Sequence, residues 1–282
     1  MLRQGINRLV GGLQSHRSIQ EQYQNRTLVL ANHWDGSVQQ FYHFFLGYYM
    51  PLSLWLDSTG ATKISVRNCG PMNIWFDQIP DSIDLEIVPP GSALHAVIGD
   101  RTKHVILQGM DDPKKFGEKE LRAGLQSIRQ QLRIDPLDSL RQHKILIVDR
   151  ATSEDFYHGP ESETHMSGRE RRHVPNLSDL ANEPTGDQVI EVVDFARMSP
   201  IEQIQSAQSA TTLVGQHGAG LVHMLWMPAG SNVIEIAPPL PQQVEHIFER
   251  LAHALGHNYT RIAQESVHAS VNLAVIKELL FQ

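Results

Sequence analysis

The stretch TTLVGQHGAGLVHMLWMPAGSNVIEI, residues 211–236, decides the fold of this chain. Leu213 and Val214 indicate a buried strand, and the glycines that follow let the backbone turn sharply and approach a ligand closely. The next apolar segment is predicted to be a short helix that Pro228 ends. A second strand then carries Glu235 to its carboxyl end. The stretch therefore reads as the strand–turn–helix–strand unit of an α/β protein.

The glycine-rich turn predicts an anion site. A helix that begins after the turn would aim its free N–H groups and the positive end of its dipole at a phosphate or diphosphate. We expect that group to contact His217, Gly218, Ala219 and Gly220. Glu235 is expected to bind ribose hydroxyls, because ligands of doubly wound sheets lie at the carboxyl ends of strands. A tight turn without any ligand is the alternative interpretation of the glycines.

Strands and helices alternate along the whole chain, as in parallel α/β sheets. The segment 133–138 is the best candidate for a linker, and the polar segment 152–172 is predicted to be a long loop of functional or mobile character. Strands are expected at 27–31, 63–66, 85–88, 104–107, 144–148, 188–193, around Leu213, at 233–236 and at 259–262. Helices are expected at 38–56, 116–132, from Ser199-Pro200 onward, at 242–254 and at 269–281.

The composition agrees with a soluble enzyme of two domains. The chain has 282 residues with 41% hydrophobic content, enough for two cores. A formal net charge of −7 gives no basic field for nucleic acid. The single cysteine, Cys69, excludes an internal disulfide framework and favours a reducing, cytoplasmic compartment. Residues 1–12 are too weakly apolar for a signal peptide but could lie on the inner face of a membrane. The sequence does not indicate an oligomeric state.

Residues 211–236 closely resemble the V-G-x-H-G-A-G-L signature of glycosyltransferase family 61, with its Met-x-x-Gly stop and its Glu on the next strand. Three further segments are similar to motifs of that family: NHWDGSVQQFYHFFL at 32–46, KILIVDR at 144–150 and RERRHVPN at 169–176. The resemblance spans about residues 28 to 240. The family includes enzymes of capsular polysaccharide biosynthesis as well as O-GlcNAc and xylosyl transferases.

This resemblance implies the GT-B fold, in which two Rossmann-like domains face each other across a cleft. Residues 1–135 would form the N-terminal acceptor domain and 136–265 the nucleotide-sugar domain, with the helix in 266–282 packing back on the N-terminal domain. The implied activity is an inverting transfer of a sugar from a UDP-sugar to a glycan or another hydroxyl acceptor. The UDP-sugar is a substrate, and no other cofactor is expected.

The leaving diphosphate needs positive charge, and the chain contains no D-x-D motif that would hold a metal for it. We therefore expect no metal and assign the charge to Arg150, at the end of a strand, and to Arg171 and Arg172. A solvated charged loop is the alternative for the last two. Asp111-Asp112 is interpreted as the lead-in to a helix rather than as a metal site.

The catalytic base is predicted to be His43 or Asp35. His43 lies early in the first long helix, on the opposite wall of the cleft, and Asp35 lies in the turn before it. Members of the family commonly carry an acidic residue where this chain has Gly47. A core role for His43 and a turn role for Asp35 are the bland alternatives.

Two other classes of function remain open. The glycines Gly215, Gly218 and Gly220 with Glu235 loosely mimic the fingerprint of an NAD-type Rossmann oxidoreductase. The short helix before Pro228 argues against that class. A nucleotide-sugar or glycan-binding protein without turnover is the third class, because the acidic residue expected at position 47 is missing.

Overall fold

The computed structural model describes residues 26–33, 37–88, 103–134, 144–150, 152–164, 167–182 and 188–281. Three sequence predictions concern other parts of the chain and lie outside these residues. They are the membrane-facing segment 1–12, the base candidate Asp35 and most of the linker at 133–138.

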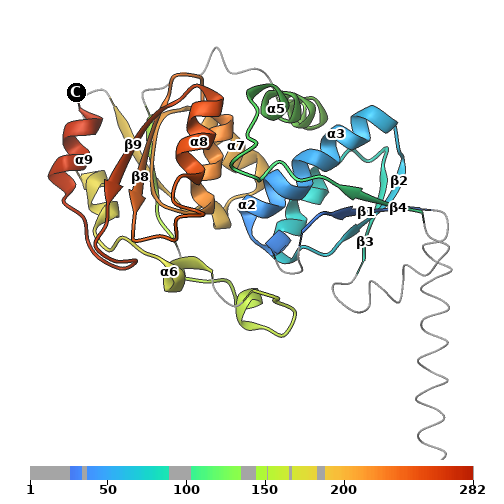
Figure 1. Cartoon of the computed structure of the whole chain (residues 1–282), viewed down its shortest axis with the longest axis horizontal. Helices are drawn as coiled ribbons and strands as arrows, with labels where there is room; N and C mark the ends of the chain where they lie inside the picture. Colours follow the sequence, from blue (N-terminus) through green and yellow to red (C-terminus); the bar gives the residue numbers. More distant parts are fainter. Residues whose placement is uncertain are drawn as a thin grey trace, which may run out of the picture.

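The N-terminal unit is built on a four-stranded parallel sheet (Figure 1). Val29, on the central strand, lies between Val66 and Val105 and is fully buried. The chain runs outward from this strand in both directions, so the sheet has a point where the strand order reverses. The strands are β1 (Thr27–Ala31), β2 (Lys63–Arg67), β3 (Asp84–Val88) and β4 (His104–Leu107), in the spatial order β3-β2-β1-β4.

A long helix follows β1 and fills the space behind the pocket described below. It starts after the turn η1 (Ser37–Gln39) and runs through α2 (Phe41–Phe44), a wider π-helical segment η2 (Phe45–Tyr49) and α3 (Met50–Thr59). Residues 44–53, in the middle of this segment, are all buried and nearly all apolar, which suits a helix packed on every side. It ends at Gly60, whose left-handed φ of 63° caps the helix. The amphipathic helix α5 (Glu118–Leu132) packs across α3. The short helix η3 (Gly70–Gln78) was not predicted.

The C-terminal unit contains a five-stranded parallel sheet in the order β6-β5-β7-β8-β9. Its first helix, α7 (Pro200–Gln208), starts as predicted at Ser199, whose side chain forms a reciprocal capping box with Glu202. The strands are β5 (Lys144–Val148), β6 (Val189–Val193), β7 (Ala210–Gln216), β8 (Asn232–Ala237) and β9 (Asn258–Ala263). The other helices and helical turns are η4 (Asp155–His158), α6 (Gly168–Arg171), η5 (Leu177–Asn182), η6 (Phe195–Arg197), η7 (Ala219–Trp226), α8 (Ile247–Leu255) and α9 (Leu273–Leu280).

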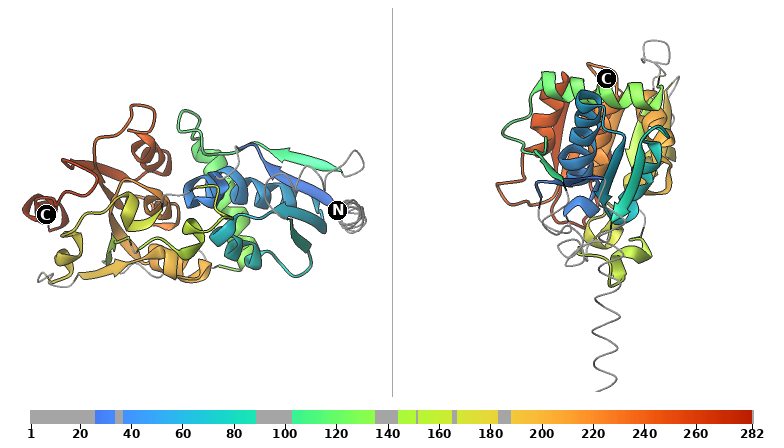
Figure 2. Two further views of the ribbon diagram at one scale, coloured as in Figure 1. Left: turned by 90° about the horizontal axis from the view of Figure 1, so that it is seen from below. Right: turned by 90° about the vertical axis from the view of Figure 1, so that its right-hand side faces the viewer.

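The two parallel sheets confirm the predicted fold class, α/β with two Rossmann-like units. The short helix predicted after β7 is present and is of the 3-10 type, with tighter turns than an α-helix. One expectation about helices needs correction. The last helix, α9, does not pack on the N-terminal unit. Ile276 and Leu280 lie with Ile145 and Leu177 in a core of the C-terminal unit itself, and both views place α9 at the far end of the molecule (Figures 1 and 2).

The two units share one continuous hydrophobic core, which we call the shared core. It joins Val29 and Phe45 of the first unit to Leu213 and Trp226 of the second. The rings of Phe45 and Trp226 meet edge to face, with centroids 5.8 Å apart. The units therefore pack directly on each other, side by side (Figure 2). Within the described residues, no helix is both long and apolar enough to cross a membrane.

Candidate functional site

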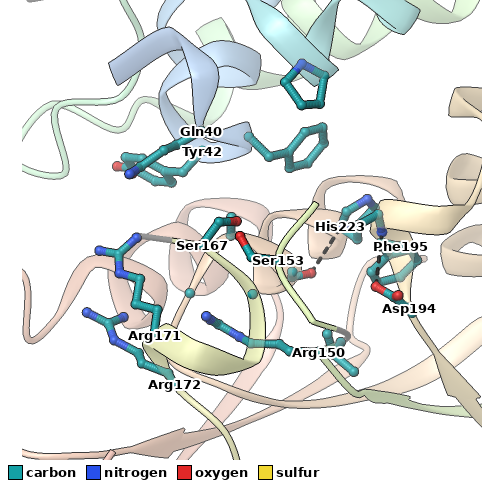
Figure 3. Close-up of a pocket in the computed structure, with 18 of the residues that line it drawn as sticks. Gln40, Tyr42, Arg150, Ser153, Ser167, Arg171, Arg172, Asp194, Phe195 and His223 are labelled. Atoms are coloured by element: carbon teal, nitrogen blue, oxygen red, sulfur yellow. Dashed lines mark hydrogen bonds between the residues drawn. The ribbon is translucent and has the colours of Figure 1, made fainter. Parts of the chain in front are cut away.

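Each sheet has one topological switch point, where neighbouring strands are connected in opposite directions. In the N-terminal sheet it lies between β1 and β4, and in the C-terminal sheet between β5 and β7. Helices that follow such strands leave on opposite faces, so ligands bind beyond the carboxyl ends. A pocket of about 470 Å³ lies at the switch point of the C-terminal sheet, and its opposite wall comes from α2 and η3 of the N-terminal unit. In Figure 3, Gln40 and Tyr42 of the N-terminal helix face the arginines of the C-terminal unit.

Three arginines line the C-terminal wall: Arg150 after β5, and Arg171 and Arg172 in and after α6 (Figure 3). Arg150 and Arg172 both donate to the main-chain oxygen of His217, at 3.0 and 2.9 Å. None of the three forms an ion pair with a carboxylate of a described residue. Burial, helped by the charge of the neighbouring guanidiniums, lowers the pKa of Arg150 and of Arg172 to about 10. All three stay charged at neutral pH, so this wall offers three positive charges to the pocket.

The glycine turn leaves room for this wall. Gly218 has a φ of 158°, and a Cβ placed on it would lie 1.7 Å from Nη2 of Arg150. A Cβ on Gly220 would lie 2.6 Å from Cγ1 of Val148. The predicted contact residues Gly218, Ala219 and Gly220 all line the pocket. The two glycines therefore let the turn lie directly against Arg150 and β5.

His217 lines the pocket, but its ring is held from behind. Its Nδ1 lies 2.6 Å from Oε1 of Glu235, and the hydroxyl of Tyr259 donates to the other carboxylate oxygen at 2.5 Å. Glu235 is fully buried and does not line the pocket. Both of its oxygens are used inside the protein, so the geometry does not support the expected contact with ribose.

The N-terminal wall carries a second imidazole–carboxylate pair. Nδ1 of His43 lies 2.7 Å from Oδ2 of Asp111, and Nε2 of His33 lies 2.8 Å from the same oxygen. Burial raises the pKa of Asp111, but hydrogen bonds and charge from the two imidazoles outweigh burial and lower it to about 2. His43 lines the pocket with a side chain that is 33% exposed. Asp111 therefore holds His43 by one nitrogen and leaves the other to the pocket.

Asp111 is the functional candidate that the sequence analysis missed. It follows β4, whereas His33 follows β1, so the switch point brings them together. A Cβ on Gly47 would lie 2.5 Å from Nε2 of His33 and 3.2 Å from Oδ2 of Asp111. The family that the sequence resembles commonly carries an acidic residue at the position of Gly47. Here the carboxylate of Asp111, from another part of the chain, lies beside that position. The interpretation of Asp111 as the lead-in to a helix is incomplete, because it gives no role to the side chain, which binds His43.

The ligand atoms of His33, His43 and Asp111 lie within 4.8 Å of one another, so this group could also hold a metal ion. It is the one such group of histidine, cysteine and carboxylate side chains among the described residues. His43 forms a hydrogen bond of 2.7 Å with Asp111, whereas Nε2 of His33 lies 2.8 Å from the same oxygen without hydrogen-bond geometry. The side chains would have to move apart to surround an ion. That no metal is required remains a prediction.

The segment 152–164, with 167–172 after it, is a strap that joins the two units along the pocket. It leaves the C-terminal sheet after β5 and lies below both units in Figure 1. Glu163 forms a bidentate ion pair with Arg67 of β2, at 2.7 and 2.8 Å. The hydroxyl of Tyr157 donates to the main-chain oxygen of Gln39. The described parts of the predicted long loop thus contribute to the wall that carries Arg171 and Arg172.

His223 has a structural place. Its ring is stacked between Phe195 and Phe41, with centroids 3.6 and 4.8 Å away, and both of its nitrogens have protein partners. Burial lowers the pKa of this histidine to about 3. It therefore stays neutral and supports the wall of the pocket.

Two Rossmann-like α/β units with a pocket between them are consistent with the GT-B fold of glycosyltransferases. The sequence matches the profile of the family described as Glycosyltransferase 61 over residues 41–234, more than half of the chain. The protein belongs to glycosyltransferase family 61. No curated protein matches the sequence significantly.

Proposed function

We propose that the protein is an inverting, metal-independent glycosyltransferase that moves a sugar from a UDP-sugar to a hydroxyl of a glycan or similar acceptor. One observation carries the proposal. A single pocket combines a cluster of arginines that lack carboxylate partners among the described residues with an imidazole–carboxylate pair from the opposite unit.

The arginine wall suits the leaving group. A nucleoside diphosphate gains negative charge as the bond to the sugar breaks, and fixed guanidiniums stabilise that charge without moving. Arg150 and Arg172 are already oriented, because the oxygen of His217 holds both. Arg171 adds a third charge at the same wall. These contacts support a mechanism in which no metal ion is needed at the diphosphate.

The opposite wall suits the acceptor. Asp111 binds Nδ1 of His43, so Nε2 is free to accept the proton of an acceptor hydroxyl. The acceptor oxygen then bonds to the anomeric carbon, the bond from that carbon to the diphosphate oxygen breaks, and UDP leaves with the electron pair. Attack from the face opposite the leaving group inverts the anomeric centre. His43 is thus the proposed base, and Asp111 orients it; Asp35 remains the second candidate for the base.

The other two classes have less support. Membership of a glycosyltransferase family and the short helix η7 after β7 both argue against an NAD-type oxidoreductase. A binding protein without turnover differs from the proposal by one measurable property, the release of UDP. The pair of His43 and Asp111 favours turnover, since binding alone needs no oriented base.

Incubation with a panel of UDP-sugars, followed by an assay of released UDP, tests the proposal. Asp111→Asn should lower turnover by about 10–100-fold, the usual effect of losing a partner that orients a functional histidine. Its UDP affinity should stay within about twofold of the wild type. The neighbouring, half-exposed Asp112→Asn is the matched control and should change neither quantity. Absence of turnover with every donor, despite UDP binding, would favour the binding protein.

A further inference from the structure

The inference concerns Glu235 and Tyr259, which lie behind the pocket and touch no part of it. Glu235 is fully buried, and a carboxylate offers only acceptors. Burial, followed by the hydrogen bond and the charge of Glu235, raises the pKa of Tyr259 well above its usual range, so this hydroxyl keeps its proton and is the donor. The second oxygen needs a donor too, and Nδ1 of His217, 2.6 Å away, is the group in reach.

This arrangement decides where the proton of a neutral His217 lies. With the hydrogen on Nδ1, the other nitrogen, Nε2, carries only a lone pair. Nε2 has no hydrogen-bond partner among the described residues, and His217 lines the pocket. A neutral His217 would therefore repel a phosphate oxygen. It becomes a donor to that oxygen only by taking up a second proton.

The charged groups around His217 determine how readily its ring takes up the second proton. Burial lowers the pKa of His217, Glu235 on β8 raises it, and Arg172 and Arg150 on the other side lower it again, with a net lowering. Tyr259 on β9 is neutral, and Phe248 of α8 contributes only an aromatic edge. A diphosphate would offset the two guanidiniums and leave Glu235 unopposed. The balance at His217 would then favour the charged ring.

We propose that Glu235, whose second oxygen accepts from Tyr259, is a positioning residue that fixes the tautomer of His217, so that a nucleoside diphosphate binds together with one proton taken up at Nε2. The proposal rests on the proposed function and adds proton linkage to donor binding. Its sign follows from the geometry. Binding is tightest where His217 is readily protonated and weakens as pH rises, by up to about tenfold in affinity per pH unit for one linked proton.

Titration calorimetry with UDP tests the linkage, at about pH 6 to about pH 8 and in buffers with different heats of ionisation. The terminal phosphate of UDP titrates as well, with a pKa of roughly 6. The titration of the phosphate is the same for every variant, so it cancels when the pH dependences of two variants are compared with UDP as the probe. Wild-type protein should take up protons on binding, and its affinity should fall with pH.

Glu235→Gln is the decisive variant. An amide at this position can accept from Tyr259 and donate to Nδ1 of His217, which moves the proton of the neutral ring to Nε2. UDP should then bind without proton uptake, and at high pH more tightly than to the wild type. Loss of a purely structural contact would not flatten the pH dependence. Tyr259→Phe is the matched control, because it removes a buried hydrogen bond but keeps the tautomer and the slope.

His217→Gln provides a second route if Glu235→Gln does not fold, and it should also abolish the linked proton. A pH slope that persists in either variant, or a wild type without proton uptake, overturns the inference and leaves the proposed function intact. If neither UDP nor inorganic pyrophosphate binds at all, the inference and the arginine wall of the proposed function fail together.

Discussion

The pocket contains two imidazole–carboxylate pairs, one on each wall, and they are bonded alike. Asp111 holds Nδ1 of His43, and Glu235 holds Nδ1 of His217. Their surroundings differ. The side chain of His43 is 33% exposed and has a second imidazole, His33, beside its carboxylate, whereas that of His217 is 5% exposed and has two guanidiniums on its own main-chain oxygen.

The difference teaches that the bonding of a histidine does not fix its role. A pair that is open to solvent and free of fixed cations can accept a proton from a neutral hydroxyl. A pair that is buried beside arginines suits an anion that arrives with its own charge. In the proposed mechanism, these opposite environments place the base on one wall and the diphosphate of the donor on the other. The following experiments test this division.

Replacing His43 should have the largest effect. His43→Ala should lower turnover by about 10²–10⁴-fold, the usual contribution of a general base, and leave UDP affinity nearly unchanged. Steady-state release of UDP and equilibrium binding of UDP measure the two quantities. His104→Ala is the control, since this exposed residue begins β4 at the opposite end of the same sheet. Equal losses of binding and turnover would contradict the separation of the walls.

Removing one arginine should show the opposite signature. Arg150→Met or Arg172→Met should weaken UDP binding by about 1.5–3 kcal/mol, the range for hydrogen bonds to charged groups. Calorimetry or a fluorescence titration measures the change. Arg122→Met, on the exposed face of α5, removes the same charge outside the pocket and should have no effect. A normal UDP affinity in both pocket variants would place the diphosphate elsewhere.

Asp111 should also reveal its environment through acid stability. A carboxyl whose pKa is lowered from 3.8 to about 2 on folding stabilises the folded state above the unfolded value, and this stability is lost as pH falls toward about 2. The contribution is about 2 kcal/mol. Urea unfolding between about pH 5 and pH 2 should therefore show a steeper loss for the wild type than for Asp111→Asn. Parallel curves would show that the imidazoles do not hold this carboxylate.

Adding a side chain to the glycine turn should have a moderate effect, and only on the wall that carries the arginines. Gly218→Ala keeps every charge but displaces the guanidinium of Arg150. We expect UDP affinity to fall by about tenfold, or about 1.4 kcal/mol. Gly60→Ala introduces a side chain at another glycine of positive φ, in open space, and should cost stability without changing affinity. Equal UDP affinity in both variants would argue against close packing of turn and arginine.

Chelation should have the smallest effect on the arginine wall. UDP binding should be unchanged by EDTA and by added manganese, because guanidiniums supply the positive charge. The measurement also tests the group of His33, His43 and Asp111, which could hold an ion on the other wall. UDP binding that vanishes with EDTA and returns with manganese would rule out the metal-independent mechanism.

The sequence was sufficient for the strands and for the place of Arg150, because their signals are local, whereas Arg171 and Arg172 were predicted with the help of the family resemblance. Apolar runs mark the strands, and Arg150 and His217 come directly after two of them. The pairing of His43 with Asp111 joins residues 68 positions apart. It depends on β1 and β4 being neighbours, which no periodicity predicts. Asp111 could therefore be recognised only after the strand order was known.

Glu235 shows the other limit of a local signal. Its strand was predicted at 233–236, and β8 runs from Asn232 to Ala237, so the position of Glu235 within a strand was predicted. Its side chain does not line the pocket, and its two oxygens meet Tyr259 on the neighbouring strand and His217. These neighbours depend on the order of the strands and on the path of the turn, which the local pattern does not give.

The shared core has a consequence for protein engineering. The two units of such a transferase could be exchanged between relatives if they were independent modules. In this protein they are not independent, because Trp226 packs on Phe45 of the other unit. Arg129 also lies over the indole of Trp226, 5.9 Å from its centroid. A half expressed alone would expose this aromatic seam to water, at the usual cost of uncovered apolar surface. A chimera therefore has to carry both faces of the seam from one parent, and a new donor specificity is better introduced by point changes in the wall than by exchange of the unit.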